Sequence, residues 1–154
     1  MLIHLKGDLL AEVRQHEAVL HGVNVQGKLG AGFALALRIA IPDACAPYFA
    51  ACQNQTLRPG AIVAWRSPAG SLKPSVIHCA SQEFYGSRGR ARAEWLQSSL
   101  DAARAWLDEN EIPSVAMPRI GAGLGGLSWQ NEVLPILEAT FGAWPGEARV
   151  YTLE

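Results

Sequence analysis

The chain has 154 residues, of which 49% are hydrophobic and 18% are charged, and its formal net charge at pH 7 is −1. This length fits a single domain over residues 1–154, and the balance of apolar and charged residues argues against a disordered chain. The nearly neutral charge also argues against a basic face of the kind that binds duplex nucleic acid.

The predicted elements alternate between short apolar runs of β character and longer helical patterns. In chain order, strands are expected over 2–5, 18–23, 61–65, 75–80, 114–117 and 150–153, and helices over 29–39, 43–52, 91–109 and 129–141. Ser128 is expected to cap the last helix. Strands interleaved with helices predict an α/β fold, with a mixed sheet covered by helices on both faces.

The three cysteines, Cys45, Cys52 and Cys79, form no C-x-x-C pair, and their odd number leaves no complete disulfide framework. They are expected to be buried thiols in a reducing compartment. The chain starts without a basic and apolar leader, and no apolar run approaches the roughly 20 residues that span a bilayer. We therefore expect a cytoplasmic protein with no membrane partner. No pair of histidines has convincing zinc spacing, so no protein-ligated metal is expected, while dependence on an added metal is left open. No cofactor is expected either.

Two glycine-rich loops are the most informative feature of the sequence. The first loop, residues 24–32, and the second loop, residues 120–127, each follow an apolar β-like run and lead into a predicted helix. Glycines at such a turn let backbone N–H groups approach a phosphate, and the helix N-terminus adds partial positive charge. Neither loop fits the G-x-x-x-x-G-K-[ST] or G-x-G-x-x-G nucleotide motifs. The pair predicts a diphosphate held between two walls.

These residues resemble the macrodomain family over essentially the whole chain. The motifs that carry the resemblance are 6–10 (KGDLL), 21–24 (HGVN), 27–34 (GKLGAGFA), 117–124 (MPRIGAGL) and 150–153 (VYTL). The branch that is most similar contains terminal ADP-ribose glycohydrolase and the yeast-type ADP-ribose-1″-phosphatase, with phage and bacterial relatives. The resemblance implies a three-layer α/β/α fold with a mixed six-stranded sheet and ADP-ribose in a cleft at the strand ends.

The resemblance also implies which residues bind the ligand. Asp8 matches an aspartate that accepts a hydrogen bond from the adenine amine, with Leu9, Tyr151 and Leu153 beside the adenine. Asn24 matches an asparagine that binds the distal ribose. The backbone contacts to the ribose and diphosphate are expected from Gly30, Ala31, Gly32, Gly121, Ala122, Gly123, Leu124 and Gly125. Structural roles compete with each side chain: a turn cap for Asp8, core packing for Tyr151 and a strand-end role for Asn24.

The catalytic group is less defined by the sequence. The glycohydrolase branch is associated with a lysine after the fourth strand and an aspartate in the second loop, where this chain has Ser81-Gln82 and Gly125. No lysine follows Lys73, so a lysine route from that segment is excluded. His21 is then a candidate: with a near-neutral pKa it would act as an acid or base, or orient a water. The alternative is a buried histidine that supports the loop.

The segment after the fourth strand carries further candidates. Glu83 is a possible base, Gln82 faces the expected position of the distal ribose, and either Phe84 or Tyr85 is placed to cover the ligand. Arg88 and Arg90 are placed to meet a terminal phosphate. The alternative is a polar loop whose arginines are solvated.

Three functions compete. The first is hydrolysis of ADP-ribose-1″-phosphate or of ADP-ribosyl ester linkages, with ADP-ribosylated protein or nucleic acid as further candidate substrates. The second is a non-catalytic reader of ADP-ribose. The third is binding of single-stranded nucleic acid through Tyr85 and the arginines at 88, 90 and 92, which the neutral charge disfavours. We expect a monomer that binds ADP-ribose and hydrolyses a bond at its distal ribose.

Overall fold

A six-stranded mixed sheet forms the centre of the molecule. The computed structural model describes residues 1–86, 89–123 and 125–153. The strands are β1 (Leu2–Lys6), β2 (Ala18–Val23), β3 (Ile62–Trp65), β4 (Ser75–Ala80), β5 (Ser114–Met117) and β6 (Glu147–Thr152). Their order is β1-β6-β5-β2-β4-β3, and every neighbouring pair is parallel except β3 with β4. The predicted mixed sheet is therefore confirmed.

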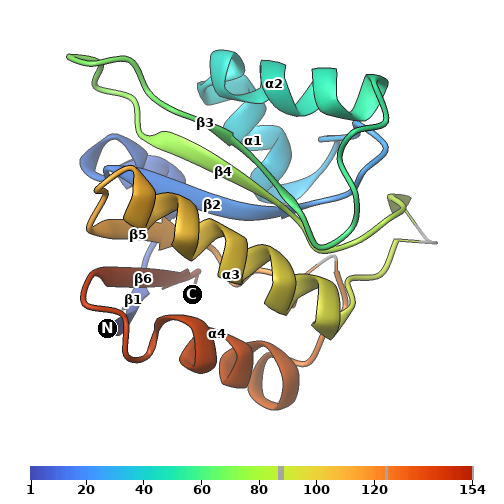
Figure 1. Cartoon of the computed structure of the whole chain (residues 1–154). Helices are drawn as coiled ribbons and strands as arrows, with labels where there is room; N and C mark the ends of the chain where they lie inside the picture. Colours follow the sequence, from blue (N-terminus) through green and yellow to red (C-terminus); the bar gives the residue numbers. More distant parts are fainter. Residues whose placement is uncertain (87–88, 124, 154) are drawn as a thin grey trace.

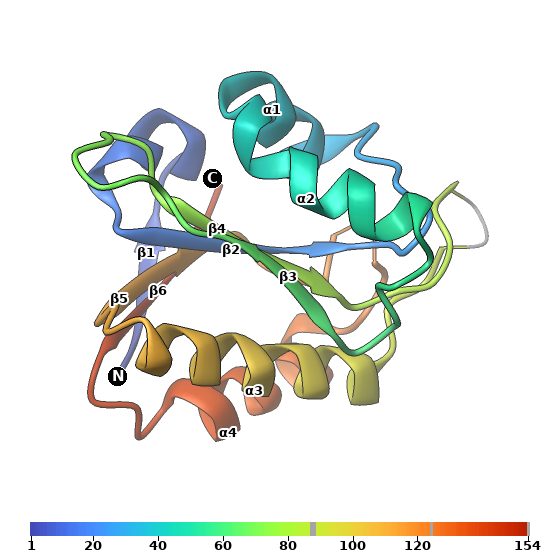
Figure 2. The same cartoon turned by 45° about the horizontal axis from the view of Figure 1, so that its top comes forward.

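Helices cover both faces of this sheet and complete three layers (Figures 1 and 2). One layer contains α1 (Gly32–Ala40) and α2 (Pro42–Gln53), and the opposite layer contains α3 (Ala93–Glu109) and α4 (Leu134–Phe141). No single helix of the described residues is long and apolar enough to cross a membrane. Only α1 and α2 taken together reach that length and composition, and they bend by 119° at their junction.

Alternation along the central strands divides the core between the two layers. Leu20 of β2 and Ile77 of β4 pack in one cluster with apolar side chains of α3 and α4. Val19 and Val76, one residue earlier on each strand, pack on the other face against Leu37 of α1. Successive side chains of a strand point to opposite faces, so both central strands are buried on both sides. This burial explains why β2 and β4 appear in the sequence as continuous apolar runs.

The topology places two loops side by side at one end of the sheet. Strands β2 and β5 are parallel neighbours, and Val19 is the register partner of Ala116. The chain leaves β2 for α1 and α2 on one face, and it leaves β5 for α4 on the other face (Figure 2). A crevice forms at the carboxyl ends of parallel strands where the connections diverge in this way, and ligands of open α/β sheets bind there.

Several boundaries differ from those predicted. Helix α1 begins at Gly32 rather than at residue 29, and β6 begins at Glu147, three residues before the predicted start. A 3-10 helix, η1 (Leu9–Gln15), was not predicted; Asp8 caps it by accepting a hydrogen bond from the Leu10 N–H. The last predicted helix begins as a π-helix, η3 (Trp129–Val133). As predicted, Ser128 caps it, because its hydroxyl accepts from the Asn131 N–H.

The cysteines are unpaired in the structure, as expected. Cys45 and Cys79 are buried and Cys52 is partly buried. Burial raises the pKa of the Cys79 thiol to about 12, so this thiol stays protonated at neutral pH.

Candidate functional site

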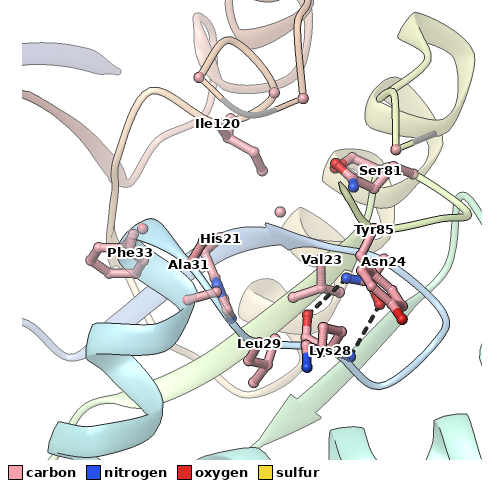
Figure 3. Close-up of a pocket in the computed structure, with 18 of the residues that line it drawn as sticks. His21, Val23, Asn24, Lys28, Leu29, Ala31, Phe33, Ser81, Tyr85 and Ile120 are labelled. Carbon is pink, nitrogen blue, oxygen red and sulfur yellow. Dashed lines mark hydrogen bonds between the residues drawn. The ribbon is translucent and has the colours of Figure 1, made fainter. Parts of the chain in front are cut away.

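A cleft of about 550 Å³ lies at the carboxyl ends of β2, β4 and β5. Figure 3 shows Ile120 on one side of this cleft and Lys28, Leu29 and Ala31 on the other. The lining residues come from the two glycine loops, the end of β2 and the segment after β4: His21, Gly22, Val23, Asn24, Lys28, Leu29, Gly30, Ala31, Gly32, Phe33, Ala34, Ser81, Gln82, Tyr85, Gly86, Gly89, Pro118, Arg119, Ile120, Gly121, Gly123 and Gly125. The structure thus brings both loops to one site.

The first loop, residues 24–32, forms the first wall of the cleft, and the side chain of Asn24 holds this wall together. Its Nδ2 donates to the Lys28 carbonyl at 2.8 Å, and its Oδ1 accepts from the backbone N–H groups of Gln26 at 3.0 Å and Lys28 at 3.3 Å. The hydroxyl of Tyr48, from α2, lies 2.8 Å from the Asn24 carbonyl and 3.1 Å from Oδ1. The amide oxygen is therefore used by the loop itself, and one Nδ2 hydrogen remains for a ligand. Binding of the distal ribose by Asn24 stays a prediction.

The first wall continues into the N-terminus of α1. Ala31 is the N-cap residue but makes no side-chain capping bond, and no acidic residue lies in the first turn. The first N–H groups of a helix have no intrahelical acceptor, so those of α1 are available where Gly32, Phe33 and Ala34 line the cleft. This end of α1 favours an anion by its dipole and its N–H groups.

The second wall is held by its own backbone. The Leu127 N–H donates to the Gly121 carbonyl at 2.9 Å, and the Gly126 N–H donates to the Gly123 carbonyl at 3.2 Å. Gly121 and Gly126 have φ values of +77° and +78°, which L side chains rarely adopt. At Gly125 an added Cβ would lie 2.7 Å from the Gly121 carbonyl oxygen. Leu124, a predicted contact, lies outside the described residues.

The cleft carries positive charge that no carboxylate neutralises. Lys28 and Arg119 both line it, whereas the described lining residues include no aspartate or glutamate. Neither cation forms a salt bridge within the part of the chain that the structure describes. The Lys28 Nζ lies 5.8 Å from the Tyr85 ring centroid, and the Arg119 guanidinium lies 4.4 Å from that of Trp129. The electrostatics of the cleft therefore suit an anionic ligand.

His21 lies at the cleft as the sequence suggested, but its protonation differs from the expectation. Its Nε2 is 2.8 Å from Nδ1 of His78, and the Nε2 of His78 is 2.8 Å from the Ala44 carbonyl oxygen. Both rings are buried. Burial lowers the pKa of His21 well below 6.5, and the neighbouring His78 lowers it further. The expected near-neutral pKa is therefore wrong, and His21 is neutral at physiological pH.

The segment after β4 is attached to the first wall. The Val25 N–H donates to the Glu83 carbonyl at 3.2 Å, and the Tyr85 N–H donates to Oε1 of Gln26 at 3.1 Å. Gln82 lines the cleft, but its Nε2 donates to the Phe84 carbonyl at 2.7 Å. Tyr85 is half exposed and lines the cleft, and its role in covering a ligand stays a prediction.

Two further candidates of this segment are not among the lining residues. Glu83 lies outside the set that lines the cleft, and so does Arg90. The Nη1 of Arg90 lies 3.8 Å from the position of a Cβ added at Gly126, which puts this arginine beside the second loop. Arg88 lies outside the described residues. The catalytic role of Glu83 and the phosphate contact of Arg90 stay predictions.

The residues predicted to bind adenine gather at the ends of β1 and β6 and do not line the cleft. Asp8 is exposed and caps η1, whereas Leu9 is buried in the core. Tyr151 is buried, and its hydroxyl lies 2.7 Å from Glu12 Oε2 and 2.8 Å from His16 Nε2. Leu153 is exposed. Ala122 also lies outside the lining set. These residues lie at the same carboxyl end of the sheet as the cleft but are not among the residues that line it. The adenine contacts therefore stay predictions.

Sequence reasoning did not select several residues that line the cleft. Lys28 and Arg119 lie within the glycine-rich motifs, and Ser81 directly follows β4. The sequence predicts ligand contacts from the backbone of the loops, not from these side chains. Phe33 and Leu29 were assigned to a buried helix. Positive charge within a glycine loop was the available signal for Lys28 and Arg119. Among the described residues, no group of three His, Cys, Asp or Glu side chains could hold a metal ion.

Comparison with known proteins gives consistent matches. A family model described as Macro domain matches residues 20–136. The chain is 31% identical over 141 residues to a DNA ADP-ribosyl glycohydrolase of Thermus aquaticus, which covers 90% of this chain and 38% of that protein. It is 28% identical to ADP-ribose glycohydrolase OARD1 of Bos taurus, covering 99% of this chain and 91% of that protein. A solved structure, the macrodomain of Thermus aquaticus DarG, superposes with a TM-score of 0.86 at 28% identity and covers 99% of this chain and 98% of that one.

Proposed function

The chain belongs to the Macro domain family, and from this premise we propose that its cleft binds ADP-ribose and hydrolyses ADP-ribose-1″-phosphate or ADP-ribosyl ester linkages. One observation carries the binding: two glycine-rich walls face each other across a cleft that contains two cations and no described carboxylate. Backbone N–H groups of both walls and the N-terminus of α1 suit a diphosphate. ADP-ribose places a diphosphate between two ribose groups, and so it matches this arrangement.

Hydrolysis is supported by the relatives. The Thermus aquaticus protein is a DNA ADP-ribosyl glycohydrolase and the bovine protein is an ADP-ribose glycohydrolase. The chain spans 38% of the length of the former, so the substrate of that whole protein is a proposal for this chain. ADP-ribosylated protein or nucleic acid are candidate substrates on the same ground. A lysine-dependent route is not available from Ser81 or Gln82, which leaves a water held at the floor of the cleft near His21 as the proposed nucleophile.

The second candidate function is a reader that binds ADP-ribose without turning it over. Two observations favour it. The oxygen of the Asn24 amide is used within its own loop, and His21 has too low a pKa to act as an acid at neutral pH. A site without a group of near-neutral pKa at the reacting end would bind and release the ligand unchanged.

Calorimetric titration with ADP-ribose, followed by turnover assays on ADP-ribose-1″-phosphate and an ADP-ribosyl ester, separates these functions. Binding with turnover is the expected result, and binding without turnover would favour the reader. The variant that tests the second wall is Gly123→Val, because no described atom lies within 4 Å of a Cβ added at this position. This variant is expected to fold normally and to lose binding by about tenfold or more through steric block of the second wall. Absence of binding to the unmodified protein would contradict the proposal.

A further inference from the structure

A chain of hydrogen bonds runs from α2 through two histidines to the cleft. The Ala44 carbonyl of α2 lies 2.8 Å from Nε2 of His78, and Nδ1 of His78 lies 2.8 Å from Nε2 of His21. The two histidines are register partners on the parallel strands β2 and β4. Both rings are buried, with 0% exposure for His78 and 1% for His21, and His21 is among the residues that line the cleft, where it packs edge-on against Phe33. This series of hydrogen bonds therefore connects a buried carbonyl of α2 to a residue that lines the cleft.

The carbonyl at one end fixes the position of each proton. A carbonyl oxygen only accepts, so Nε2 of His78 must be the protonated nitrogen. Burial lowers the pKa of His78 to about 4, so the ring is neutral and its Nδ1 carries a lone pair. Nε2 of His21 must then donate its proton to this lone pair. Because His21 is also neutral, its Nδ1 carries a lone pair as well.

The opposite arrangement would need a cation in an apolar setting. If His78 were charged, both of its nitrogens would donate and Nε2 of His21 would have to accept. The His78 ring stacks on the Tyr48 ring, with 5.2 Å between the ring centroids. Val76 and Ala80 lie on the same face of β4 as His78, and this face packs against apolar residues of α1 and α2. No carboxylate among the described residues forms an ion pair with either histidine. An unpaired buried charge is costly, so the neutral arrangement is the stable one.

The remaining nitrogen of His21 has no protein partner. Its Nδ1 is buried, and none of the described residues makes a hydrogen bond to it. A buried acceptor without a partner is a cost unless a ligand or water supplies a donor. The helix N-terminus and the two cations elsewhere in the cleft all offer positive charge or donors. The Nδ1 lone pair of His21 is thus an acceptor in a cleft otherwise suited to anions.

We propose that His78 is a positioning residue: through its bond to the Ala44 carbonyl it fixes the His21 ring so that Nδ1 can only accept a hydrogen bond, and this acceptor selects a ligand hydroxyl or a water over a phosphate oxygen. A phosphate oxygen that carries no proton has nothing to donate and is repelled by a lone pair. The ligand would therefore place its diphosphate against the walls and a hydroxyl of its distal ribose, or the attacking water, at His21. This assignment of the ligand group rests on the proposed function.

The tautomer can be measured directly on the free protein. Two-bond ¹H–¹⁵N correlation spectra of uniformly labelled protein distinguish a protonated ring nitrogen from an unprotonated one. The expected result at pH 7 is a protonated Nε2 and an unprotonated Nδ1 for both His21 and His78. A His21 ring protonated at Nδ1, or charged at pH 7, would overturn the inference whether or not the protein binds ADP-ribose.

Addition of ADP-ribose tests the ligand part. The Nδ1 resonance of His21 is expected to shift on saturation, as that nitrogen accepts a hydrogen bond. Calorimetric binding with an unchanged Nδ1 resonance would overturn the assigned role while leaving the proposed function intact. Absence of calorimetric binding would overturn the proposed function and with it the assigned ligand group, but the tautomer would already be decided by the free protein.

Three variants test His78 as the cause. His78→Leu removes the acceptor for His21 and is expected to weaken ADP-ribose binding by about tenfold and to mix the His21 tautomers. His78→Gln keeps one donor and one acceptor and is expected to retain most of the affinity. Val76→Ala, on the same face of β4, removes core packing without touching His21. Equal losses of affinity in Val76→Ala and His78→Leu, or no rescue by His78→Gln, would overturn the positioning role.

Discussion

The first and second loops form opposite walls of one cleft, yet side chains hold the first and main-chain hydrogen bonds hold the second. In the first loop, the Asn24 amide accepts or donates four hydrogen bonds, one of which comes from Tyr48 of α2. In the second loop, the Gly121 carbonyl accepts from the N–H group six residues later, and the Gly123 carbonyl accepts from the N–H group three residues later. The shape of the first wall therefore depends on the identity of one side chain, whereas the shape of the second wall depends on glycines that have no side chain.

The two walls are therefore expected to lose their shape through different kinds of substitution. The first wall loses its shape when a polar side chain is removed, because buried backbone groups are then left without partners. The second wall loses its shape when a side chain is added at Gly125, because the close backbone contacts there leave no room for a Cβ. The following variants test the two modes of failure, and they are ordered by the size of the expected effect.

The largest effect is expected for Asn24→Ala. It removes hydrogen bonds to Gln26, Lys28 and the Tyr48 hydroxyl; the bond to Tyr48 is buried, and the bonds to the loop backbone are partly buried. We expect the free energy of unfolding to fall by about 3 kcal/mol and ADP-ribose affinity to fall by about tenfold or more. Urea denaturation and calorimetry measure the two quantities.

The control for this variant is Asn110→Ala, whose side chain bonds Arg66 and Trp106 far from the cleft. It is expected to cost less than about 1 kcal/mol and to leave affinity unchanged. An Asn24→Ala protein as stable as the unmodified one would show that the side chain does not hold the first wall.

A smaller effect is expected for Gly125→Ala in the second wall. The new Cβ would lie 2.7 Å from the Gly121 carbonyl oxygen and 3.0 Å from the Ala91 Cβ, so the backbone must shift. We expect a loss of about 2 kcal/mol in the free energy of unfolding and weaker ADP-ribose binding. Gly123→Ala is the matched variant, because no described atom lies within 4 Å of its Cβ. It is expected to keep full stability, and equal destabilisation by both variants would argue against a wall that depends on close backbone packing.

Acid tests the first wall further, because the buried imidazoles of His21 and His78 pack beside it against Phe33 and Tyr48. The pKa of His78 is lowered to about 4 in the folded protein, against 6.5 when unfolded, so between these values the unfolded state binds more protons. The stability contributed by the neutral ring is present above pH 6.5 and is lost as the pH falls towards 4. We expect the free energy of unfolding to fall by about 2 kcal/mol from pH 7 to pH 5 through His78 alone. The pKa of His21 is lowered in the same direction.

Denaturation curves at several pH values in the unmodified protein and in His78→Leu measure this contribution. The variant is expected to have the flatter dependence of stability on pH. Parallel curves would show that the buried imidazoles do not cause the loss.

The structure also shows which parts of the fold were accessible from the sequence. Strands β2, β4 and β5 were predicted at their observed ends, because they are apolar runs bounded by polar or proline residues. The 3-10 helix η1 was missed because its seven residues carry a single buried apolar pair at helical spacing, Leu9 and Val13, which is too short a pattern to predict a helix. The helix start at 129 was predicted from the Ser128 cap, but not its π form. That form depends on a Val133 N–H that donates to the Ser128 carbonyl across five residues.

The site was predictable where it consists of loops and less so where it depends on strand register. Both glycine loops and Asn24 were identified as parts of the cleft, since a glycine-rich turn after an apolar run is a local pattern that the sequence shows directly. The pairing of His21 with His78 was not, because residues 57 positions apart meet only through the parallel register of β2 and β4. Asp8 and Tyr151 lie at the ends of β1 and β6, outside the lining of the cleft, and this placement depends on the strand order; their contact with adenine stays a prediction.

The smallest effect is expected for Tyr85→Ala, at the segment that covers the first wall. Tyr85 is 50% exposed, and its ring lies 5.8 Å from the Lys28 ammonium. We expect a change in the free energy of unfolding of less than about 0.5 kcal/mol and a loss of a few-fold in ADP-ribose affinity. Tyr85→Phe keeps the ring and is expected to bind normally in the same titration. A greater loss in Tyr85→Phe than in Tyr85→Ala would contradict a role for the aromatic face.

The contact between Arg119 and Trp129 has an optical consequence. The chain contains five tryptophans, and Trp129 is the one whose indole lies 4.4 Å from the guanidinium of a cleft residue. A ligand that draws Arg119 towards a phosphate would remove a positive charge from the face of this indole and alter its emission. Intrinsic fluorescence would then report occupancy of the second wall without a label, and Trp129→Phe would identify the source of the signal.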